Sequence, residues 1–493
     1  MWLLKGKIGN SFPVATWQVF TLLNWAVTLS AIVLILFFLM LGACSSLSGP
    51  EYERPSVVEK DAWTQQQPLS VNGAETIRLD WWRNFNDPYL DSLMLQALSN
   101  NSDLRILSAR VGVAEAAIGQ ANAARLPTID AALGANYLKA EGGDLSRSYS
   151  QAFAIGWEAD IWGKLKKGVS AQSAEFNASE ADWRAGYLTL ASNVSSTYFK
   201  IRQFDEQIVR QQKSLDKSDA ILSIFTASFR EGLAPKTQVL QQQAEVNRLG
   251  IDLLELQRLR QLSENALATL LGVPAGDLTV PAEQLSDSVK LIKVPGGLPA
   301  DLLSRRPDIV AAEYRVLQAH ELEGQARLAK LPGFSLTANT GNTSLDLIDL
   351  LKSWTFGLTP TVNIPIFDPG VNARLRVSEA QSKLVVEEYR ATVMRALEEV
   401  ERALVNLTNR KLQRSKLLER QAQLRLVTLQ IEAQLEEGLV TQLQVFESER
   451  SLLSTELALL ENYQNLLSDT VSLYKALGGG WPPLNVGEEK KPG

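Results

Sequence analysis

Few side chains in this sequence of 493 residues are suited to chemistry. It holds one cysteine, Cys44, and one histidine, His320. Zinc and copper sites need clusters of such ligands, and Ser/His or Cys/His hydrolases need a base beside a nucleophile. His320 stands beside Glu321 on a polar stretch, which is typical of a surface histidine. The sequence also has no glycine-rich phosphate loop followed by Lys and Ser or Thr. We therefore expect no enzyme, no metal site and no cofactor.

The charge balance argues against nucleic-acid binding. The chain carries 49 Lys and Arg against 55 Asp and Glu, a formal net charge of -6, with a pI near 5.3. A protein that holds a phosphate backbone needs a basic surface. No Lys- or Arg-rich run supplies one locally, so we expect no nucleic-acid partner.

The one cysteine follows an apolar segment near the N-terminus. Residues 26–43 carry no charge, two lysines precede them, and they end in Leu41-Gly42-Ala43-Cys44. This arrangement resembles a bacterial lipoprotein signal. It predicts a signal peptide over residues 1–43 and a covalent lipid on Cys44, and the serines that follow imply transfer to the outer membrane. An uncleaved anchor is the alternative, since about 18 apolar residues nearly reach the roughly 20 that span a bilayer.

The chain beyond the signal repeats itself. The stretch from Asp103 to Pro127 matches that from Asp308 to Pro332, an offset of 205 residues, and Glu231-Gly232-Leu233 matches Glu437-Gly438-Leu439 at 206. Such a period is far longer than a solenoid repeat of about 20 to 50 residues, so we read it as a duplicated domain half. We divide the chain into a signal peptide (1–43), a lipidated extended strap (44–80), repeat one (81–272), an inter-repeat equatorial segment (273–305), repeat two (306–478) and a C-terminal tail (479–493).

Each repeat contains two segments with the alternation of a β-strand. Apolar side chains occupy every second position over residues 128–137 and 153–161, and again over 334–339 and 354–366. We expect β-hairpins at about 126–162 and 332–367. Strands of about ten residues can cross a bilayer when tilted. A half-buried hairpin of a soluble sheet is the alternative, but the export signal favours membrane strands.

Four strands cannot close a membrane barrel by themselves, because an open edge leaves backbone groups unpaired in lipid. Bacterial barrels start at about eight strands, so the barrel must be shared between chains. Two chains would give eight strands and three would give twelve. A wider barrel can hold a channel, which favours a trimer if the protein is a conduit.

Very long helices follow the hairpins. Residues 164–229 and 370–437 contain no interior proline and hardly any glycine, and shorter helices return over 236–271 and 441–477. At 1.5 Å per residue, a run of about 65 residues extends close to 100 Å. Leucines that recur every seven residues on the second pair predict a coiled-coil seam. The predicted fold class is thus mainly α with a membrane β-barrel, built from a duplicated strand hairpin and long helical hairpin.

Four motifs lie behind the signal: Trp81-Trp82-Arg83-Asn84-Phe85-Asn86-Asp87-Pro88, Asp160-Ile161-Trp162-Gly163-Lys164-Leu165, Arg305-Arg306-Pro307-Asp308-Ile309 and Glu437-Gly438-Leu439-Val440. Together they resemble the motifs of outer-membrane efflux lipoproteins of the TolC/OprM (NodT) type. The resemblance covers residues 44–480 and implies a homotrimer, whose twelve pooled strands form an outer-membrane barrel continued by a helical barrel across the periplasm. It implies the exit duct of a tripartite pump that passes drugs or other small toxic compounds from an inner-membrane RND-type transporter through a periplasmic adaptor.

The resemblance also places a gate at the periplasmic tip, closed at rest and opened when the adaptor and transporter dock. It assigns the constriction to Leu443 and Glu447, which share one helix face at spacing i, i+4. Three copies of Glu447 around the axis would make the pore favour cations. The alternative is that Glu447 is a solvated carboxylate of a coiled coil with no role in the constriction. Many relatives carry an aspartate where this chain has glutamine, which predicts a less acidic resting gate. The remaining tip residues are Gln444, Thr237 and Gln238 beside the constriction and Gly232 and Gly438 in the turns.

Two other functions stay open. A TolC-like duct for type I protein secretion shares the implied architecture, although by resemblance such ducts usually lack the lipoprotein signal. A periplasmic adaptor lipoprotein also combines a lipid anchor with a helical hairpin, but adaptors carry one hairpin and this chain has two. The expected location is the outer membrane, with a lipid anchor, an embedded barrel and an extension into the periplasm. The sequence does not specify the substrate.

Overall fold

The computed structural model describes residues 49–57, 60, 62–64, 78–139, 141–285, 305–352 and 354–481. Cys44 and the signal peptide predicted at 1–43 lie outside the described residues, as do most of the inter-repeat segment and most of the C-terminal tail. The elements are, in chain order, η1 (Trp81–Phe85), α3 (Pro88–Asn100), α4 (Ser102–Ala123), β1 (Thr128–Lys139), β2 (Leu145–Ala159), α5 (Lys164–Arg230), α6 (Lys236–Leu270), α9 (Pro307–Leu328), β3 (Gly333–Ser344), η3 (Leu347–Leu351), β4 (Thr355–Asn363), α10 (Pro369–Glu436) and α11 (Gln442–Ala476).

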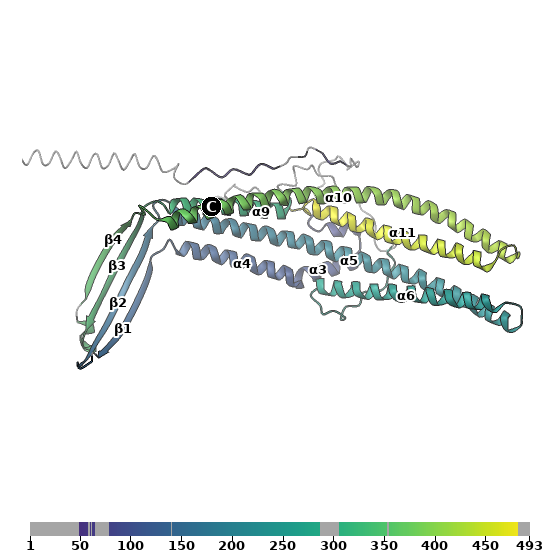
Figure 1. Ribbon diagram of the computed structural model, residues 1–493, viewed down its shortest axis with the longest axis horizontal. Coiled ribbons are helices and arrows are strands. Elements are labelled where there is room, and N and C mark those ends of the chain that lie inside the picture. The colour runs from purple at the N-terminus through teal and green to yellow at the C-terminus, as the bar shows by residue number, and fades with distance from the viewer. Residues whose placement is uncertain are drawn as a thin grey trace, which may run out of the picture. The chain divides into compact units, whose positions relative to one another are not determined.

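The protein is mainly helical with one small sheet, and each half carries a strand hairpin followed by a long helical hairpin (Figure 1). This confirms the predicted duplicated fold. The described residues divide into two units. One consists of residues 49–53, 121–169 and 320–379 and contains the sheet. The other consists of residues 54–120, 170–319 and 380–481 and is helical.

All four strands form one antiparallel sheet in the order β1-β2-β3-β4 (Figure 1). The pairing of β2 with β3 joins the two repeats, with Ile155 opposite Ala338. Strand β2 begins at Leu145, eight residues before the predicted alternation, and ends at Ala159. The predicted continuation through Ile161 was wrong, because the chain turns there and the carboxylate of Asp160 caps the next helix.

Both long helices begin at a capping aspartate. Asp160 accepts hydrogen bonds from the backbone N–H groups of Leu165 (2.9 Å) and Lys166 (2.8 Å) at the start of α5. Asp368 accepts one from Val371 (3.0 Å) at the start of α10. Such caps satisfy N–H groups that have no partner within the helix and place a negative charge at the positive end of its dipole.

The largest core cluster of the helical unit gathers around the first tryptophan pair. Trp81 and Trp82 are buried, and Trp81 stacks on Tyr474 of α11 with ring centroids 5.2 Å apart. Apolar side chains from η1, α3, α5, α6 and α11 complete the cluster. These two tryptophans therefore pack the helices together.

A buried ionic network fastens the start of the inter-repeat segment to this core. Arg202 of α5, 1% exposed, donates to the hydroxyl of Tyr198 (2.9 Å) and the carbonyl of Pro281, and pairs with Asp205 (3.4 Å). Tyr198 in turn donates to Asp87 (2.5 Å), the cap of α3. Burial, followed by this bond to Asp87, raises the pKa of Tyr198, so the hydroxyl stays protonated and the bond is retained at physiological pH.

The described part of the strap packs on the second helical hairpin. Trp63 is buried against a cluster that includes Val400 and Leu404 of α10 and Leu466 of α11. Lys60 and the backbone N–H of Thr64 (2.9 Å) both bond to Glu401. Burial of an anchoring aromatic side chain beside charge-assisted bonds fixes an otherwise extended segment to the helices.

Candidate functional site

The two faces of the sheet differ in chemistry. Directly paired residues of antiparallel strands share a face, so the register sorts every side chain. The apolar face collects the large hydrophobic residues, many of them exposed: Ile129, Leu133, Tyr137, Phe153, Ile155, Trp157, Phe334, Leu336, Leu358, Phe356 and Val362. The opposite face holds small and polar residues, chiefly Thr, Ser, Asn, Gly and Ala, with Leu138 near one end and the carboxylates Asp130 and Glu158.

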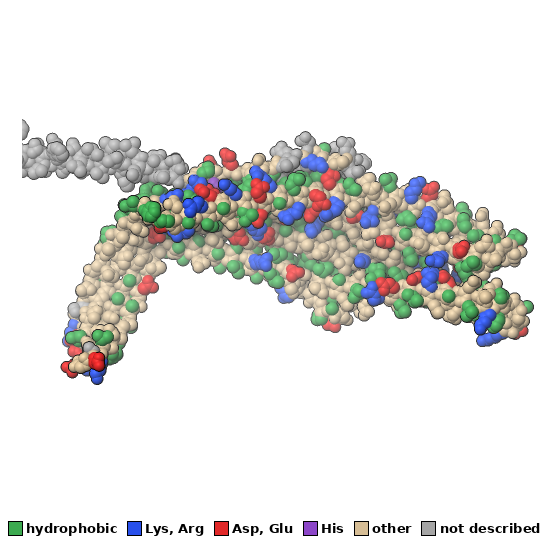
Figure 2. Space-filling view, viewed as in Figure 1, with side chains coloured by type: hydrophobic (Ala, Val, Ile, Leu, Met, Phe, Trp, Pro, Cys, Tyr) green, Lys and Arg blue, Asp and Glu red, His purple; other side chains and the backbone are tan. Residues whose placement is uncertain are grey.

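The apolar face is so exposed that it needs apolar surroundings. Leu133 is 80% exposed and Phe356 is 83% exposed. A water-facing sheet would carry polar residues there, whereas alternation of apolar and polar faces is the pattern of a strand between lipid and an aqueous lumen. Charged side chains are sparse along the middle of the sheet and gather at its turn end, where β1 joins β2 and β3 joins β4 (Figure 2). The apolar face is thus suited to lipid and the polar face to water.

Aromatic side chains flank the apolar face at both ends. Tyr137 and Tyr149 lie toward the turn end, Trp157 and Phe334 lie toward the opposite end, and Phe153 lies midway between Tyr149 and Trp157 along β2. Tyr149 and Trp157 stand eight strand positions apart, roughly 26 Å along β2. A tilted strand of this length covers most of an apolar band about 25 Å tall, and such bands carry aromatic girdles at both interfaces.

The outer edges of the sheet are open. Among the described residues, β1 pairs only with β2, and β4 pairs only with β3. Unpaired edge groups attract further strands, and in lipid each costs several kcal/mol. The sheet therefore needs strands from outside the described chain on both sides.

The two helical hairpins turn in the same way. Gly232 follows α5 with φ 76°, and Gly438 follows α10 with φ 73°. Leu233 N–H donates to Ser228 (2.8 Å), as Leu439 N–H donates to Gln434 (2.9 Å), which closes a Schellman turn in both repeats. Only glycine adopts this left-handed backbone cheaply, so the residue type follows from the turn.

The predicted gate residues lie in the first turns after these glycines. Thr237 and Gln238 occupy the first turn of α6, Leu443 and Gln444 the first turn of α11, and Glu447 the second, all exposed. Among the described residues, no hydrogen bond or ion pair joins any of the five to the other hairpin. Gln444 instead caps its own helix, since its side chain accepts from Thr441 N–H (2.9 Å). Thr237 and Gln238 follow Pro235, whose side chain makes no such cap.

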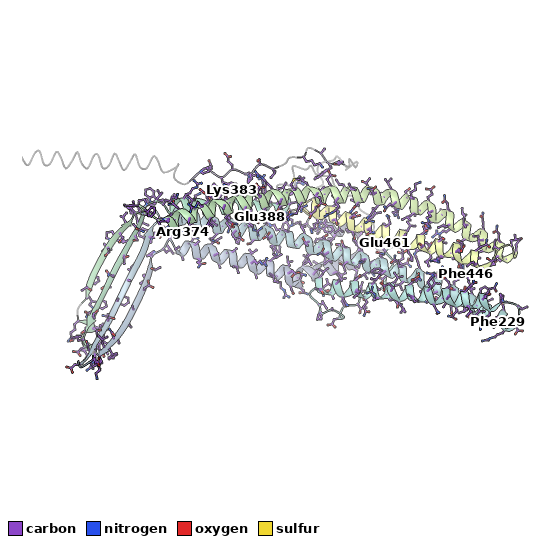
Figure 3. The ribbon with its side chains drawn as sticks, viewed as in Figure 1. Phe229, Arg374, Lys383, Glu388, Phe446 and Glu461 are labelled. Atoms are coloured by element: carbon purple, nitrogen blue, oxygen red, sulfur yellow. The ribbon has the colours of Figure 1, made fainter. Side chains whose placement is uncertain are left out.

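The ends of the hairpins also present apolar side chains. Figure 3 shows Phe229 close to the turn after α5 and Phe446 close to the turn before α11. Leu233 is 82% exposed and Leu439 is 71% exposed. The free ends of both hairpins thus combine exposed leucines with uncharged polar residues.

Ionic links that the sequence does not predict join the two hairpins below the tip. Lys217 of α5 pairs with Glu432 of α10 (2.8 Å) and with Glu449 of α11. One step further from the tip, Glu456 of α11 accepts from Arg210 of α5 (3.0 Å) and Arg425 of α10 (2.9 Å). Charges are spread along all four helices, so no local pattern in the sequence indicates which of them meet.

Other sites find little support. Within the described ranges, no group of His, Cys, Asp and Glu could hold a metal ion. No described helix is both long enough and apolar enough to cross a membrane. His320 is not the surface residue that its polar neighbours suggest, because it is half-buried against the ring of Tyr52, with centroids 5.7 Å apart.

Comparison with known families gives one clear match. The family described as outer membrane efflux protein matches residues 93–273 and 298–479. These two segments overlap the predicted repeats at 81–272 and 306–478. The match covers well over half of the chain and both helical hairpins.

Individual relatives match along nearly their whole length. The cation efflux system protein CusC of Escherichia coli O6:H1 is 30% identical over 452 residues, which cover 90% of this chain and 97% of CusC. The pyoverdine export outer membrane protein OpmQ of Pseudomonas aeruginosa is 31% identical over 472 residues, covering 92% and 97%. A crystal structure of CusC, solved to follow its folding and transmembrane channel formation, superposes with a TM-score of 0.77 at 28% identity and covers 87% of this chain and 99% of that one.

Proposed function

Because the chain belongs to the outer membrane efflux protein family, we propose that it is the exit duct of a tripartite efflux pump. It would receive drugs or other small toxic compounds from an inner-membrane RND-type transporter and a periplasmic adaptor. The family is one of outer-membrane transport proteins, so the predictions of an outer-membrane location and of no enzymatic activity are confirmed. Family membership also removes the adaptor alternative.

The observation that carries this proposal is the sheet with two open edges and one apolar face. Four strands from each of three chains would make a closed barrel of twelve and leave no unpaired edge in lipid. The apolar face would contact lipid, and the Thr, Ser, Asn and Gly face would line the lumen. Three pairs of helical hairpins would continue the duct in the periplasm, with a lipid on Cys44 as a further anchor.

The relatives do not fix the cargo. CusC is described as a cation efflux protein and OpmQ as a pyoverdine exporter, although their identities to this chain are nearly equal. A duct passes whatever its transporter delivers. Its lumen therefore needs polar side chains that keep it filled with water more than it needs a specific binding pocket. The polar face of the sheet, which is uncharged apart from Asp130 and Glu158, fits that role.

Conductance and oligomeric mass test the proposal together. We expect the purified, detergent-solubilised protein to have the mass of three chains and to give small, cation-selective openings in a planar bilayer. A monomer or dimer without conductance would contradict the shared barrel. Large, permanently open channels from a trimer would keep the duct and contradict a closed tip.

A substitution at the predicted constriction tests the gate. Glu447→Ala should raise single-channel conductance and weaken cation preference, because it removes three carboxylates from a narrow ring. The matched control is Glu461→Ala, which removes an exposed carboxylate from the same helix further from the tip. If both variants conduct like the unsubstituted channel, Glu447 is an ordinary solvated carboxylate and the constriction lies elsewhere.

A further inference from the structure

The connection between β3 and β4 exposes an unusual number of large apolar side chains. It contains the short helix η3 and contributes no residue to the core. The exposed side chains are Leu345 (70%), Leu347 (64%), Ile348 (82%) and Leu351 (70%). A loop in water normally carries polar residues, so a group of this size needs an apolar neighbour.

Two amide side chains hold η3 against the sheet. Gln151 of β2 donates to the carbonyl of Leu350 (2.8 Å), and Asn342 of β3 donates to the carbonyls of Leu350 (3.0 Å) and Asp349 (3.2 Å). Gln151 is only 7% exposed. These bonds satisfy carbonyls at the end of η3 that have no partner within so short a helix. The loop is therefore fixed at a definite place.

That place is the apolar face. The register sets Gln151 opposite Asn342, two positions along from the pair Phe153 and Thr340 on the same face. This end of the face also carries Arg147 and Ser344, and the two amides are the side chains whose bonds place η3 on it. Just after η3, Trp354 stacks on Phe153 with ring centroids 6.3 Å apart. The apolar surface of η3 thus continues that of the sheet at its turn end.

We infer that η3 makes a lipid contact, in which Leu347, Ile348 and Leu351 insert among the acyl chains of the outer leaflet. This inference rests on the proposed channel, in which the apolar face of the sheet contacts lipid. Asp349 and Lys352 pair with each other beside these residues, so the charges of the loop can remain at the level of the headgroups.

A second copy of the chain is a poorer occupant. Strands from neighbouring chains would add at the open edges, β1 and β4. The bonds from Gln151 and Asn342 hold η3 over β2 and β3, the two central strands, away from both edges. Lipid, by contrast, would cover the whole apolar face without interruption.

Spin labels in reconstituted vesicles can locate η3. The labelled variants are Ile348→Cys, Leu133→Cys on the apolar face, Ala132→Cys on the polar face and Asp144→Cys in the β1–β2 connection. The unsubstituted chain, treated in the same way, gives the background from Cys44. Each label is exposed to oxygen, which dissolves in lipid, and to a polar nickel complex, which does not. We expect the oxygen-to-nickel accessibility ratio at 348 to match that at 133 and to exceed that at 144 on the order of tenfold, because apolar surroundings exclude polar solutes.

Each alternative outcome is distinct. If the label at 133 is in lipid but the ratio at 348 matches that at 144, the proposed lipid contact of η3 is wrong and the proposed barrel is retained. If the label at 348 is shielded from both reagents, protein covers it and the proposed lipid contact of η3 is again wrong. If 133 and 132 are equally exposed to nickel, the proposed barrel itself fails.

A second experiment tests the amides. Gln151→Leu should narrow the spectrum of a label at 348, because η3 loses a bond that restrains it. Thr340→Val is the matched control, since its hydroxyl has no hydrogen-bond partner among the described residues and it lies on the same face. An unchanged spectrum in Gln151→Leu would show that this amide does not position η3.

Discussion

A Glu456→Gln variant should conduct about fivefold more current at rest than the unsubstituted channel. Glu456 links three helices, since it accepts from Arg210 of α5, Arg425 of α10 and Gln421 of α10 (3.1 Å). A partly exposed ion pair contributes about 0.5 kcal/mol, so two of them shift the closed-to-open balance by about 1 kcal/mol, or roughly fivefold. Glutamine keeps the size of the side chain and removes its charge.

The measurement is the time-averaged resting current per channel in planar bilayers. Glu461→Gln makes the same chemical change on an exposed position of the same helix and should leave the conductance unchanged (Figure 3). An equal rise in both variants would mean that net charge, rather than the link between hairpins, controls the current. No rise in either would mean that the hairpins do not separate when the tip opens.

Acid should act on the same link in the unsubstituted protein. Burial alone would raise the pKa of Glu456, but hydrogen bonds from Arg425, Gln421 and Arg210, together with the charge of Arg210, lower it below its usual 4.5. A carboxylate with a lowered pKa stabilises the closed hairpins above pH 4.5, and this contribution is lost as the pH falls from 4.5 through the lowered value. Resting conductance should therefore rise in that acidic range, and less so in Glu456→Gln.

The sequence predicts the helices and strands well because their signals are local. A capping aspartate and a turn glycine bracket α5, so the predicted 164–229 differs by one residue from Lys164–Arg230. Alternation marks the strands where both faces differ in polarity. It fails from Leu145 to Ser150, where serines occupy every second position and pairing with β1 and β3 decides the conformation instead.

The parts that the sequence does not predict depend on contacts between distant segments. Nothing near Gln151 indicates that its amide binds a loop 199 residues away. Likewise, Arg210 and Glu456 are 246 residues apart and look like any other charges on long helices. The positions of Leu443 and Glu447 follow from the turn glycine, but the links that hold the hairpins together beneath them required the fold. Local patterns thus predict where the elements lie, and only the packed helices show which charges pair between them.

Replacing Arg202 with methionine should lower the free energy of unfolding by about 3 kcal/mol, because removing one partner of a buried ion pair leaves the others unsatisfied. Its loss would remove the guanidinium's hydrogen bonds to the carbonyl of Pro281 and the hydroxyl of Tyr198, and its ion pair with Glu283. The lower end of the usual range is appropriate, since Asp205 keeps a second partner in Arg260 (2.5 Å). Methionine fills much of the space that arginine leaves, so a cavity adds little to the loss.

Unfolding of the helices in detergent by urea, followed by circular dichroism, measures this effect. Arg258→Met on α6 is the matched control, because Arg258 pairs with Glu255 at 2.7 Å while both side chains are more than half exposed. That variant should leave the free energy of unfolding unchanged within experimental error, because solvent screens an exposed pair. Equal stability of the two variants would contradict a structural role for the buried network. A large loss confined to Arg202→Met would instead show that the buried network, which bonds α5 to the start of the inter-repeat segment, stabilises the helical unit.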